Sequence, residues 1–313
     1  MIQVSRLRVL CELHRRGTLA AVAEALVYSP SAVSQQLRQL EREVGAPLIE
    51  PAGRGVSITE QGLILVKLGN QIFRLIEHAE AELDASLTEV RGTLRVAAFQ
   101  TAALTLLPIA INDLKQRYPL VKIEFTEAEP ESALPALVSS EFDLVIVESY
   151  PGYPPPIVEG VHVAHLMNDP LWLAMDQITA SQLDPARDPV SQLAEAGWAM
   201  ELDKSVPAMW LSDRCRRSGF EPVIACRSED LVVQRQLVVS GLAVAVLPGL
   251  ALLDIGKELT LFPTGEGLDH REILMATRAS SQGKLAVDAL RESLHNAAAS
   301  VAGAVDFPSP RAY

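Results

Sequence analysis

Polar side chains spaced as on one helix face carry the chemistry that nucleic-acid recognition needs. Two hydroxyls, one amide and two guanidinium groups recur at helical intervals: Ser31, Ser34, Gln35, Arg38 and Arg42. Hydroxyl and amide groups hydrogen-bond to base edges, while guanidinium groups bind phosphate and the edge of guanine. The alternative is an ordinary solvated face, which is the commoner fate of a polar helix surface. The flanking sequence decides between these interpretations.

The helix that would carry this face has its start and its end specified in the sequence. Ser29 can accept a hydrogen bond from an unpaired backbone N–H, Pro30 suits the first helical position, and Gly45 supplies a left-handed final residue. The opposite face is an apolar stripe that must pack on a neighbour, made of Val33, Leu37, Leu40 and Val44. We therefore predict a helix over 30–44, with Ser29 and Pro30 joining its candidate DNA-binding surface.

Shorter helices precede this one, and a hairpin follows it. Leu7, Leu10 and His14 lie at three- and four-residue intervals and predict a first helix. Thr18 can cap a second helix, whose many alanines permit close crossing by the helix over 30–44. Residues 53–59 predict a two-stranded wing with Arg54 at its tip, where an arginine can enter the minor groove. A winged helix-turn-helix of this kind fits the major groove of DNA.

With these residues in place, the first ninety residues resemble the DNA-binding region of LysR-type transcriptional regulators. The shared pattern comprises Leu26, Ala32-Val33-Ser34, Leu40-Glu41-Arg42-Glu43-Val44-Gly45 and Ile58-Thr59-Glu60-Gln61-Gly62. Two departures concern the bases that are read: Ser29-Pro30-Ser31 stands where the family commonly has S-Q-P, and Gln35 stands where an arginine often follows the serine. Because an amide pairs with adenine N6 and N7, Gln35 favours adenine over guanine.

The segment over 59–90 has no proline and predicts one long helix. Apolar and small side chains alternate at four- and three-residue intervals, as in a coiled-coil seam: Leu65, Gly69, Ile72, Ile76, Ala79, Leu83, Ser86 and Val90. Such a helix would span about 45 Å and could pair with its twin. An amphipathic helix buried on its own domain is the alternative. The resemblance implies a homodimer that pairs further into a homotetramer.

The charge of the chain is unevenly distributed. The 313 residues carry a formal charge of −12, whereas residues 1–60 contain seven Lys or Arg against six Asp or Glu. A weakly basic head on an acidic body favours local, dimer-dependent DNA binding over coating of nucleic acid by bulk electrostatics. No charged-then-apolar signal segment opens the sequence, and its most apolar stretch, 242–253, is interrupted by Pro248 and Gly249. We therefore expect a soluble cytoplasmic protein without a membrane partner.

After residue 91 the pattern changes to short apolar strands alternating with helices, which predicts an α/β domain with a largely parallel sheet. We expect strands over 94–99, 121–126, 142–147, 171–175, 198–200, 223–226, 243–247 and 273–277, and helices over 102–118, 130–140, 206–218, 229–240 and 283–299. The segment 237–248 matches the family's L-V-x-x-G-x-G-x-x-x-L-P, with Ala243 in place of the second glycine. The resemblance implies a two-lobed, periplasmic-binding-protein-like effector domain.

The predicted organisation follows from these patterns and the resemblance together. It comprises a winged helix-turn-helix domain over 1–58, a linker and dimerisation helix over 59–90, an effector-binding domain over 91–301 and a flexible tail over 302–313. The effector domain divides into lobe I, 91–163 with 270–301, and lobe II, 164–269.

Ligands of open α/β sheets bind beyond the carboxyl ends of the strands. The candidate effector site therefore collects residues from several strand ends: Phe99, Gln100, Thr101, Glu127, Glu148, Glu201, Asp203 and Arg227. Thr101, at the start of a helix, can hold a carboxylate together with the helix N–H groups, although a plain helix cap fits equally well. The acidic strand ends, which include Glu129, instead suit a cationic or zwitterionic effector, unless their carboxylates are merely solvated or paired.

The function that the resemblance implies is a regulator that binds a palindromic operator and responds to a small-molecule effector. Its partners are double-stranded DNA and the effector, with RNA polymerase left open. The alternative is a solute-binding protein or an enzyme on the same two-lobed body. The chain has no G-x-S-x-G, P-loop, G-x-G-x-x-G or H-E-x-x-H motif, so we predict no enzyme and no cofactor. Cys11, Cys215 and Cys226 lack disulfide or metal spacing, so no metal is expected; paired cysteines sense peroxide in some LysR-type members, a role left open for Cys215 and Cys226.

Overall fold

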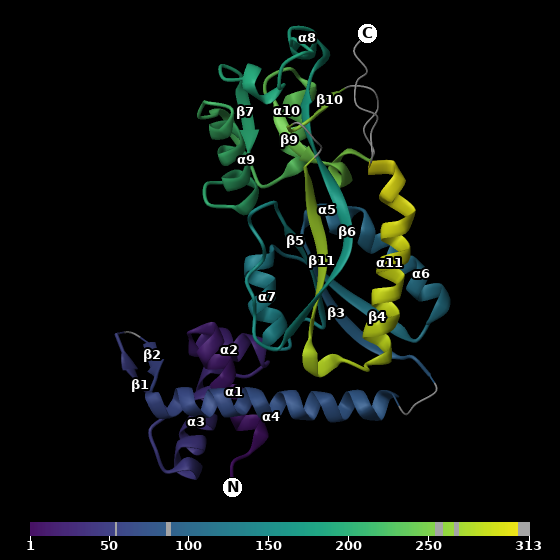
Figure 1. Ribbon diagram of the computed structural model, residues 1–313. Coiled ribbons are helices and arrows are strands. Elements are labelled where there is room, and N and C mark those ends of the chain that lie inside the picture. Colours follow the sequence, from purple (N-terminus) through teal and green to yellow (C-terminus); the bar gives the residue numbers. More distant parts are fainter. Residues whose placement is uncertain (54, 86–88, 254–258, 266–268, 306–313) are drawn as a thin grey trace. The chain divides into compact units, whose positions relative to one another are not determined.

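The computed structural model describes residues 1–53, 55–85, 89–253, 259–265 and 269–305 (Figure 1). The chain divides into two compact units, one containing residues 1–88 and the other nearly all of the rest. Each unit has its own hydrophobic core. Among the helices of the described ranges, none combines the length and apolar character that crossing a membrane requires.

The first unit begins with the predicted helices. They are α1 (Val4–Arg16), α2 (Leu19–Ala25) and α3 (Pro30–Val44), so the predicted bounds of the helix over 30–44 are confirmed. The core between them contains Leu10, Val22, Val33, Leu37 and Leu40, all without exposed surface. His14 is exposed, and Leu13 takes the buried position on α1, because the buried stripe follows Leu10 at three residues rather than four.

A hairpin follows α3 and forms the wing. Strands β1 (Ile49–Ala52) and β2 (Gly55–Ile58) pair antiparallel, with Ile49 opposite Ile58. The wing therefore starts four residues before the predicted range over 53–59, because Ile49 and its neighbours supply the first strand. Arg54, predicted at the tip, lies outside the described residues.

Helix α4 (Glu60–Ala85) closes this unit by packing along α1. A Cβ added at Gly69 would lie 2.9 Å from Cys11 Sγ, so the glycine permits the close approach of the two helices. The predicted seam is therefore wrong at its start, since Gly69 and the half-buried Leu65 face the unit's own core. It is wrong at its end as well, because Val90 packs against the core of the second unit. Ser86 lies outside the described residues.

The second unit is built on a mixed sheet whose strand order is β10-β6-β11-β5-β3-β4, with β9 also pairing with β6. Strand β3 pairs parallel with β4 and β5, whereas β11 pairs antiparallel with both β5 and β6. The prediction of a largely parallel sheet is thus wrong for this sheet, in which four of the six described strand pairings are antiparallel. The chain leaves one lobe through β6 and returns through β11, so these two long strands must run in opposite directions (Figure 1). The bounds are β3 Gly92–Ala98, β4 Val121–Glu127, β5 Leu144–Ser149, β6 Val161–Met175, β9 Ala245–Pro248, β10 Thr260–Pro263 and β11 His270–Arg278.

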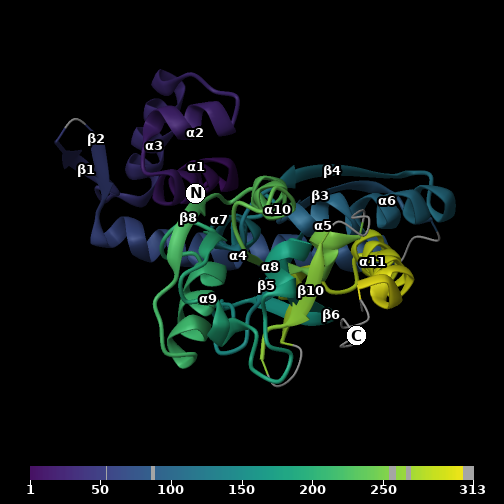
Figure 2. The ribbon, with the colours of Figure 1, turned by 90° about the horizontal axis from the view of Figure 1, so that it is seen from above.

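Helices cover both lobes of this unit. In lobe I, α11 lies beside α6 (Figures 1 and 2). The lobe I helices are α5 Gln100–Leu104, α6 Leu106–Arg117, α7 Pro130–Val138 and α11 Leu285–Val305. Lobe II contains the parallel pair β7 Gly197–Met200 and β8 Val223–Arg227, with α8 Gln177–Ser181, α9 Val206–Arg217 and α10 Leu231–Val239. Short 3₁₀ turns lie at Val190–Gln192, Gly249–Leu252 and Ala279–Ser281.

The helix predicted over 102–118 is interrupted in the structure. Helix α5 ends at Leu104, and α6 begins at Leu106. Pro108 explains the break, because its ring has no N–H and collides with the carbonyl four residues earlier in a continuous helix. The short α5 that results presents Gln100 and Thr101 at the carboxyl end of β3.

Candidate nucleic-acid interface and effector site

Helix α3 is fixed at both ends by the residues that the sequence singled out. Ser29 Oγ accepts a hydrogen bond from the Ala32 backbone N–H at 3.1 Å, and the hydroxyls of Ser29 and Ser31 lie 2.9 Å apart. Gly45 adopts a left-handed conformation, with φ of 76°, and ends the helix. Because three residues of the apolar stripe are buried and Val44 is half-buried, α3 turns mainly its polar face to solvent.

The polar face of α3 is open along the helix. Ser31, Gln35, Arg38 and Arg42 are exposed, as are Ser29 and Pro30 at its start. Ser34 is half-buried, and its hydroxyl donates to the Pro30 carbonyl at 3.1 Å. The arrangement brings all the predicted DNA-binding residues of this helix onto one surface, with an amide and two guanidinium groups outermost.

Other side chains of α3 fix the position of the wing. Glu41 Oε1 accepts hydrogen bonds from the backbone N–H groups of Leu48 and Ile49, at 2.9 and 3.2 Å. A Cβ added at Gly62 would lie 2.3 Å from the Leu48 carbonyl oxygen, so α4 can approach this loop only because residue 62 is glycine. Glu41 and Gly62, both part of the pattern shared with LysR-type regulators, therefore hold the hairpin against the recognition helix rather than contact a ligand.

In the second unit, a buried arginine gathers three of the predicted effector-site residues. Arg271 is 2 % exposed on β11. Its guanidinium donates to Thr101 Oγ1 at 2.6 Å and to Asp169 Oδ2 at 2.7 and 2.9 Å, and it forms an ion pair with Glu148. The guanidinium carbon also lies 5.1 Å from the centre of the Phe99 ring. Thr101 is itself 2 % exposed, so its hydroxyl faces Arg271 rather than open solvent.

Arg271 stays charged because its neighbours outweigh its burial. Burial alone lowers the pKa of Arg271, but the carboxylates of Asp169 and Glu148 raise it above the ordinary value. Burial raises the pKa of Glu148 and of Asp169 in turn, and the positive charge of Arg271 opposes that rise. The cluster therefore holds one guanidinium against two buried carboxyl groups.

Two further carboxyl groups face this cluster. Burial raises the pKa of Glu201 to about 8, and the negative charge of Glu148 adds to the rise. The pKa of Glu129 is raised to about 7 by partial desolvation, with Glu148 again the strongest charged neighbour, although Glu129 is an exposed residue. Within the described part of the chain, no lysine or arginine lies at ion-pair distance from either group. Both Glu201 and Glu129, which follows β4 by two residues, are among the acidic strand-end residues that the sequence indicates.

The remaining predicted residues lie around this centre. Gln100 joins the two lobes: its Nε2 donates to Asp230 Oδ1 at 3.0 Å, and its Oε1 accepts from the Leu231 N–H at 3.1 Å. Arg227 pairs with Asp203 at 2.7 Å and donates to the Glu201 carbonyl at 3.2 Å. Glu127 is exposed at the end of β4. Asp203 and Arg227 thus form an ion pair with one another, while Gln100 links lobe I to lobe II through its two hydrogen bonds.

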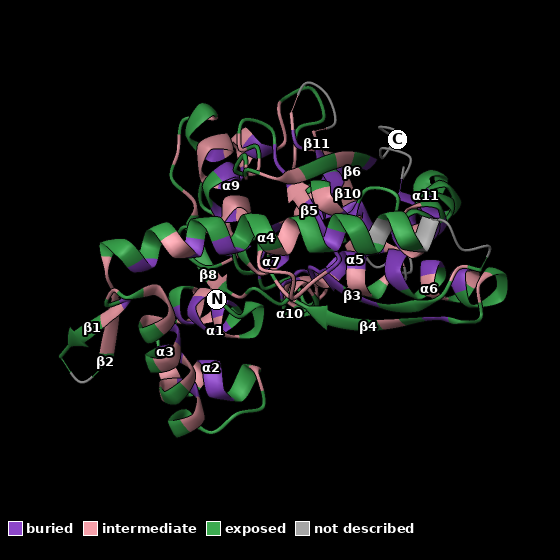
Figure 3. Cartoon of the chain, turned by 90° about the horizontal axis from the view of Figure 1, so that it is seen from below, coloured by how far each residue is buried: buried purple, intermediate pink, exposed green. Residues whose placement is uncertain are grey.

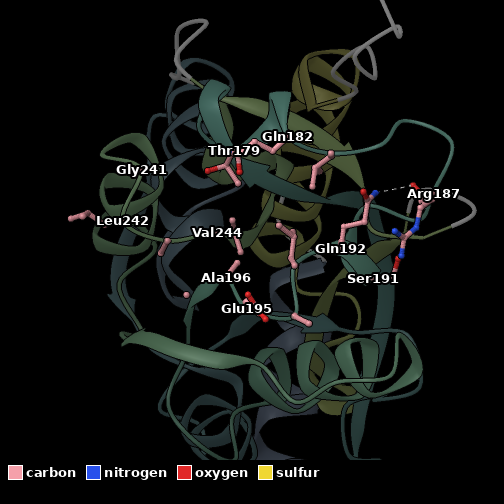
Figure 4. A pocket seen from close by; sticks show the side chains of 15 residues that line it. Thr179, Gln182, Arg187, Ser191, Gln192, Glu195, Ala196, Gly241, Leu242 and Val244 are labelled. Atoms are coloured by element: carbon pink, nitrogen blue, oxygen red, sulfur yellow. Dashed lines mark hydrogen bonds between the residues drawn. The ribbon is translucent and has the colours of Figure 1, made fainter.

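A separate hollow of about 710 Å³ lies elsewhere in lobe II (Figure 4). Its lining includes Thr179, Arg187, Gln192 and Gly241. Gly197, where β7 begins, is among its lining residues, whereas Glu201 follows the other end of that strand. The Gln192 amide is held by the backbone of Asp184, so this wall is structural. A much smaller cavity, about 20 Å³, lies under Glu201 between Tyr150 and Trp210.

The cysteines fit a structural role. Burial raises the pKa of the Cys11 thiol and of the Cys215 thiol to about 12 in each case. Since the thiolate is the reactive form, such thiols react slowly with oxidants. Cys226 is half-buried in β8.

Comparison with known proteins agrees with both units. The family described as "Bacterial regulatory helix-turn-helix protein, lysR family" matches residues 4–63, and the "LysR substrate binding domain" matches residues 88–299. A probable RuBisCO transcriptional regulator of Emiliania huxleyi is 31% identical over 175 residues, which span 56% of this chain and about half, 55%, of that relative. The transcriptional dual regulator GltC of Bacillus subtilis is 27% identical over 256 residues, which span 79% of this chain and 81% of GltC.

Solved structures agree on the fold. A full-length OxyR variant from Pseudomonas aeruginosa superposes with a TM-score of 0.69 at 20% sequence identity, over 94% of this chain and 95% of that one. The two family matches together cover most of the sequence, and they coincide with the winged helix-turn-helix and with the two-lobed unit. The chain therefore belongs to the LysR family of bacterial transcriptional regulators, with a helix-turn-helix DNA-binding domain and an effector-binding domain.

Proposed function

We propose that this protein regulates transcription in the cytoplasm as a homodimer that reads a palindromic operator with α3. The observation that carries the proposal is the open face of α3, on which Gln35, Arg38 and Arg42 are exposed opposite a stripe whose members Val33, Leu37 and Leu40 are fully buried. A twofold dimer would set two such helices in successive major grooves, about 34 Å apart. Family relatives named as transcriptional regulators support this function.

The exposed apolar face of α4 supports the dimer. Leu75 and Leu83 are 69% and 68% exposed, which is unusual for leucines on a helix of 26 residues. Exposed residues recur along α4 (Figure 3), and apart from Leu63 the large apolar ones among the described side chains form one row: Ile64, Leu68, Ile72, Leu75, Ile76 and Leu83. A second copy of the helix presents the same row of apolar residues, and pairing of the two helices would bury both rows. Further pairing into a homotetramer is part of this proposal.

The effector would bind at the carboxyl ends of the strands, between the lobes. Because Glu148 and Asp169 already engage Arg271, the carboxyl groups of Glu129 and Glu201 have no described cation opposite them. This excess of acid supports an effector that carries positive charge. A ligand that binds one arrangement of the lobes more tightly than the other would shift the spacing of the DNA-binding heads.

The charge of the effector can be tested with matched pairs of small molecules. Phenylethylamine and phenylpropionate share an aromatic tail and differ in the charge of the head group. We expect amines to raise the melting temperature of the wild-type protein and to lose this effect in the Glu201→Gln variant. Stabilisation by anionic aromatic acids alone would rule out a cationic effector.

Operator binding is tested by footprinting on the promoter region beside the gene that encodes this chain. We expect protection of two half-sites one helical turn apart and a changed pattern when a stabilising amine is added. Conversion of a metabolite by a purified protein that protects no DNA would favour the enzyme alternative.

A further inference from the structure

The turn between α2 and α3 contains a residue in an unfavourable conformation. Val27 has a φ of 56°, in the left-handed region that β-branched residues rarely adopt. The Tyr28 N–H donates to the Ala23 carbonyl at 2.8 Å and the Val27 N–H to the Glu24 carbonyl at 3.3 Å, the two bonds of a Schellman helix end. Glycine or asparagine is the usual residue at the position that Val27 occupies.

The Val27 side chain is too exposed to stabilise the fold by packing. Val27 is 90% exposed and Tyr28 is 47% exposed, although both are large hydrophobic residues. The neighbouring Leu26 is half-buried and packs against the core of this unit, so the turn is already anchored without Val27. Both the backbone conformation and the exposure of Val27 therefore favour a smaller or polar residue for stability alone.

The position of Val27 in the helix-turn-helix suggests that its side chain serves recognition. Val27 stands two residues before Ser29, which caps α3, and the exposed Ser31 and Gln35 follow on the first turns. In helix-turn-helix proteins the amino-terminal end of the recognition helix contacts base edges. An apolar side chain at that end is continuous with the DNA-binding face, and in the major groove its natural partner is the C5-methyl group of thymine.

We propose that Val27 is a base-reading residue, which packs its isopropyl group against a thymine methyl group in each operator half-site. The inference rests on the proposed function, since it requires α3 to lie in the major groove. It extends the predicted reading surface, which comprised serine hydroxyls, an amide and guanidinium groups, by an apolar contact. The strained turn is then maintained for recognition rather than for folding.

The test distinguishes a role in folding from a role in recognition, because substitution of Val27 should maintain or raise stability but lower the affinity for DNA. Val27→Asn and Val27→Gly relieve the strained conformation, and asparagine does so without the extra chain entropy of glycine. In the full-length protein we expect amide hydrogen exchange over residues 19–44 of Val27→Asn to be as slow as in the wild type or slower. Affinity for the operator should nevertheless fall, by about fourfold for each thymine methyl group that no longer packs against the side chain.

Thymine-to-deoxyuridine replacement identifies the contact directly, because it removes only the methyl group. For the wild type, one such replacement in a single half-site should weaken binding by about fourfold, and one in each half-site by about sixteenfold. The same replacement should leave the affinity of Val27→Asn unchanged, and replacements elsewhere should affect both proteins alike.

Three results would overturn the inference. The first is wild-type affinity in both Val27 variants, and the second is the lack of any thymine at which the two proteins respond differently. The third is faster exchange over residues 19–44 in both variants, which would make Val27 a residue of the fold. If the wild-type protein bound no DNA site selectively, the proposed function itself would be refuted. The wild-type measurement alone would show this, independently of the Val27 variants.

Discussion

Replacement of Arg271 by leucine should destabilise the second unit far more than any surface ion pair can. Its side chain is 3% exposed, and its partners Asp169 and Glu148 are 0% and 11% exposed. Removal of one partner from a buried ion pair typically costs about 3–5 kcal/mol, because the remaining charges stay buried without compensation. At about 2–4 °C per kcal/mol, the melting temperature should fall by on the order of 10 °C.

Arg216 offers a matched control in the same unit. It also forms two ion pairs, with Asp213 and Glu221, but its side chain is 56% exposed. Exposed pairs contribute little, so Arg216→Leu should leave the unfolding transition nearly unchanged. Arg271→Lys should fall between the two, since a lysine keeps the charge but lacks the planar fork that reaches Asp169, Glu148 and Thr101 together.

Intrinsic fluorescence provides the assay. The chain has three tryptophans, Trp172, Trp198 and Trp210, and all are buried in the second unit. Urea unfolding followed at tryptophan therefore reports this unit without a contribution from the DNA-binding domain. Equal unfolding free energies for Arg271→Leu and Arg216→Leu would refute the view that the buried cluster organises the site.

The remaining predictions concern packing, pH and assembly. Gly62→Ala should destabilise the DNA-binding domain, as its Cβ would lie 2.3 Å from the Leu48 carbonyl, whereas Gly303→Ala, with open space around it, should be tolerated; calorimetry distinguishes them. Folding raises the pKa of Glu201 from 4.5 to about 8, so the folded state favours the protonated form, and stability should decline as pH rises through this range. Glu201→Gln should remove that part of the decline in urea titrations from about pH 5 to 9, and an unchanged slope would contradict the pKa assignment. Leu75→Asp should prevent the proposed dimer from forming, so that size-exclusion chromatography detects a monomer, while Asn70→Asp, which adds the same charge, should not.

The helix ends of the DNA-binding domain could be predicted because they follow from local chemistry. Ser29 and Gly45 act on backbone groups within four residues of themselves, so the sequence near each end contains the whole signal. Val27 also had a local signal: a valine follows α2 where a glycine or asparagine is expected. Because the pattern of a helix-turn-helix is set mainly by its buried positions, an exposed residue in the turn contributes little to it.

The effector site was only half predicted, because its centre is assembled from distant parts of the chain. Arg271 lies 170 positions from Thr101, 123 from Glu148 and 102 from Asp169. Strand ends could be found from hydrophobic runs, which located Thr101 and Glu148. No local pattern indicates that β11 returns between β5 and β6, and without that topology Arg271 is merely a charged residue in a strand.

The central claim is that α3 reads DNA with separate residues for bases and for phosphates. It is tested most directly by the affinity of Gln35→Ala and Arg38→Ala for operator and altered sites over a range of salt concentrations. We predict that Arg38→Ala weakens binding to every sequence and reduces the salt dependence by about one phosphate contact, whereas Gln35→Ala changes base preference and leaves the salt dependence intact. Identical effects of the two substitutions on sequence preference and on salt dependence would contradict the account.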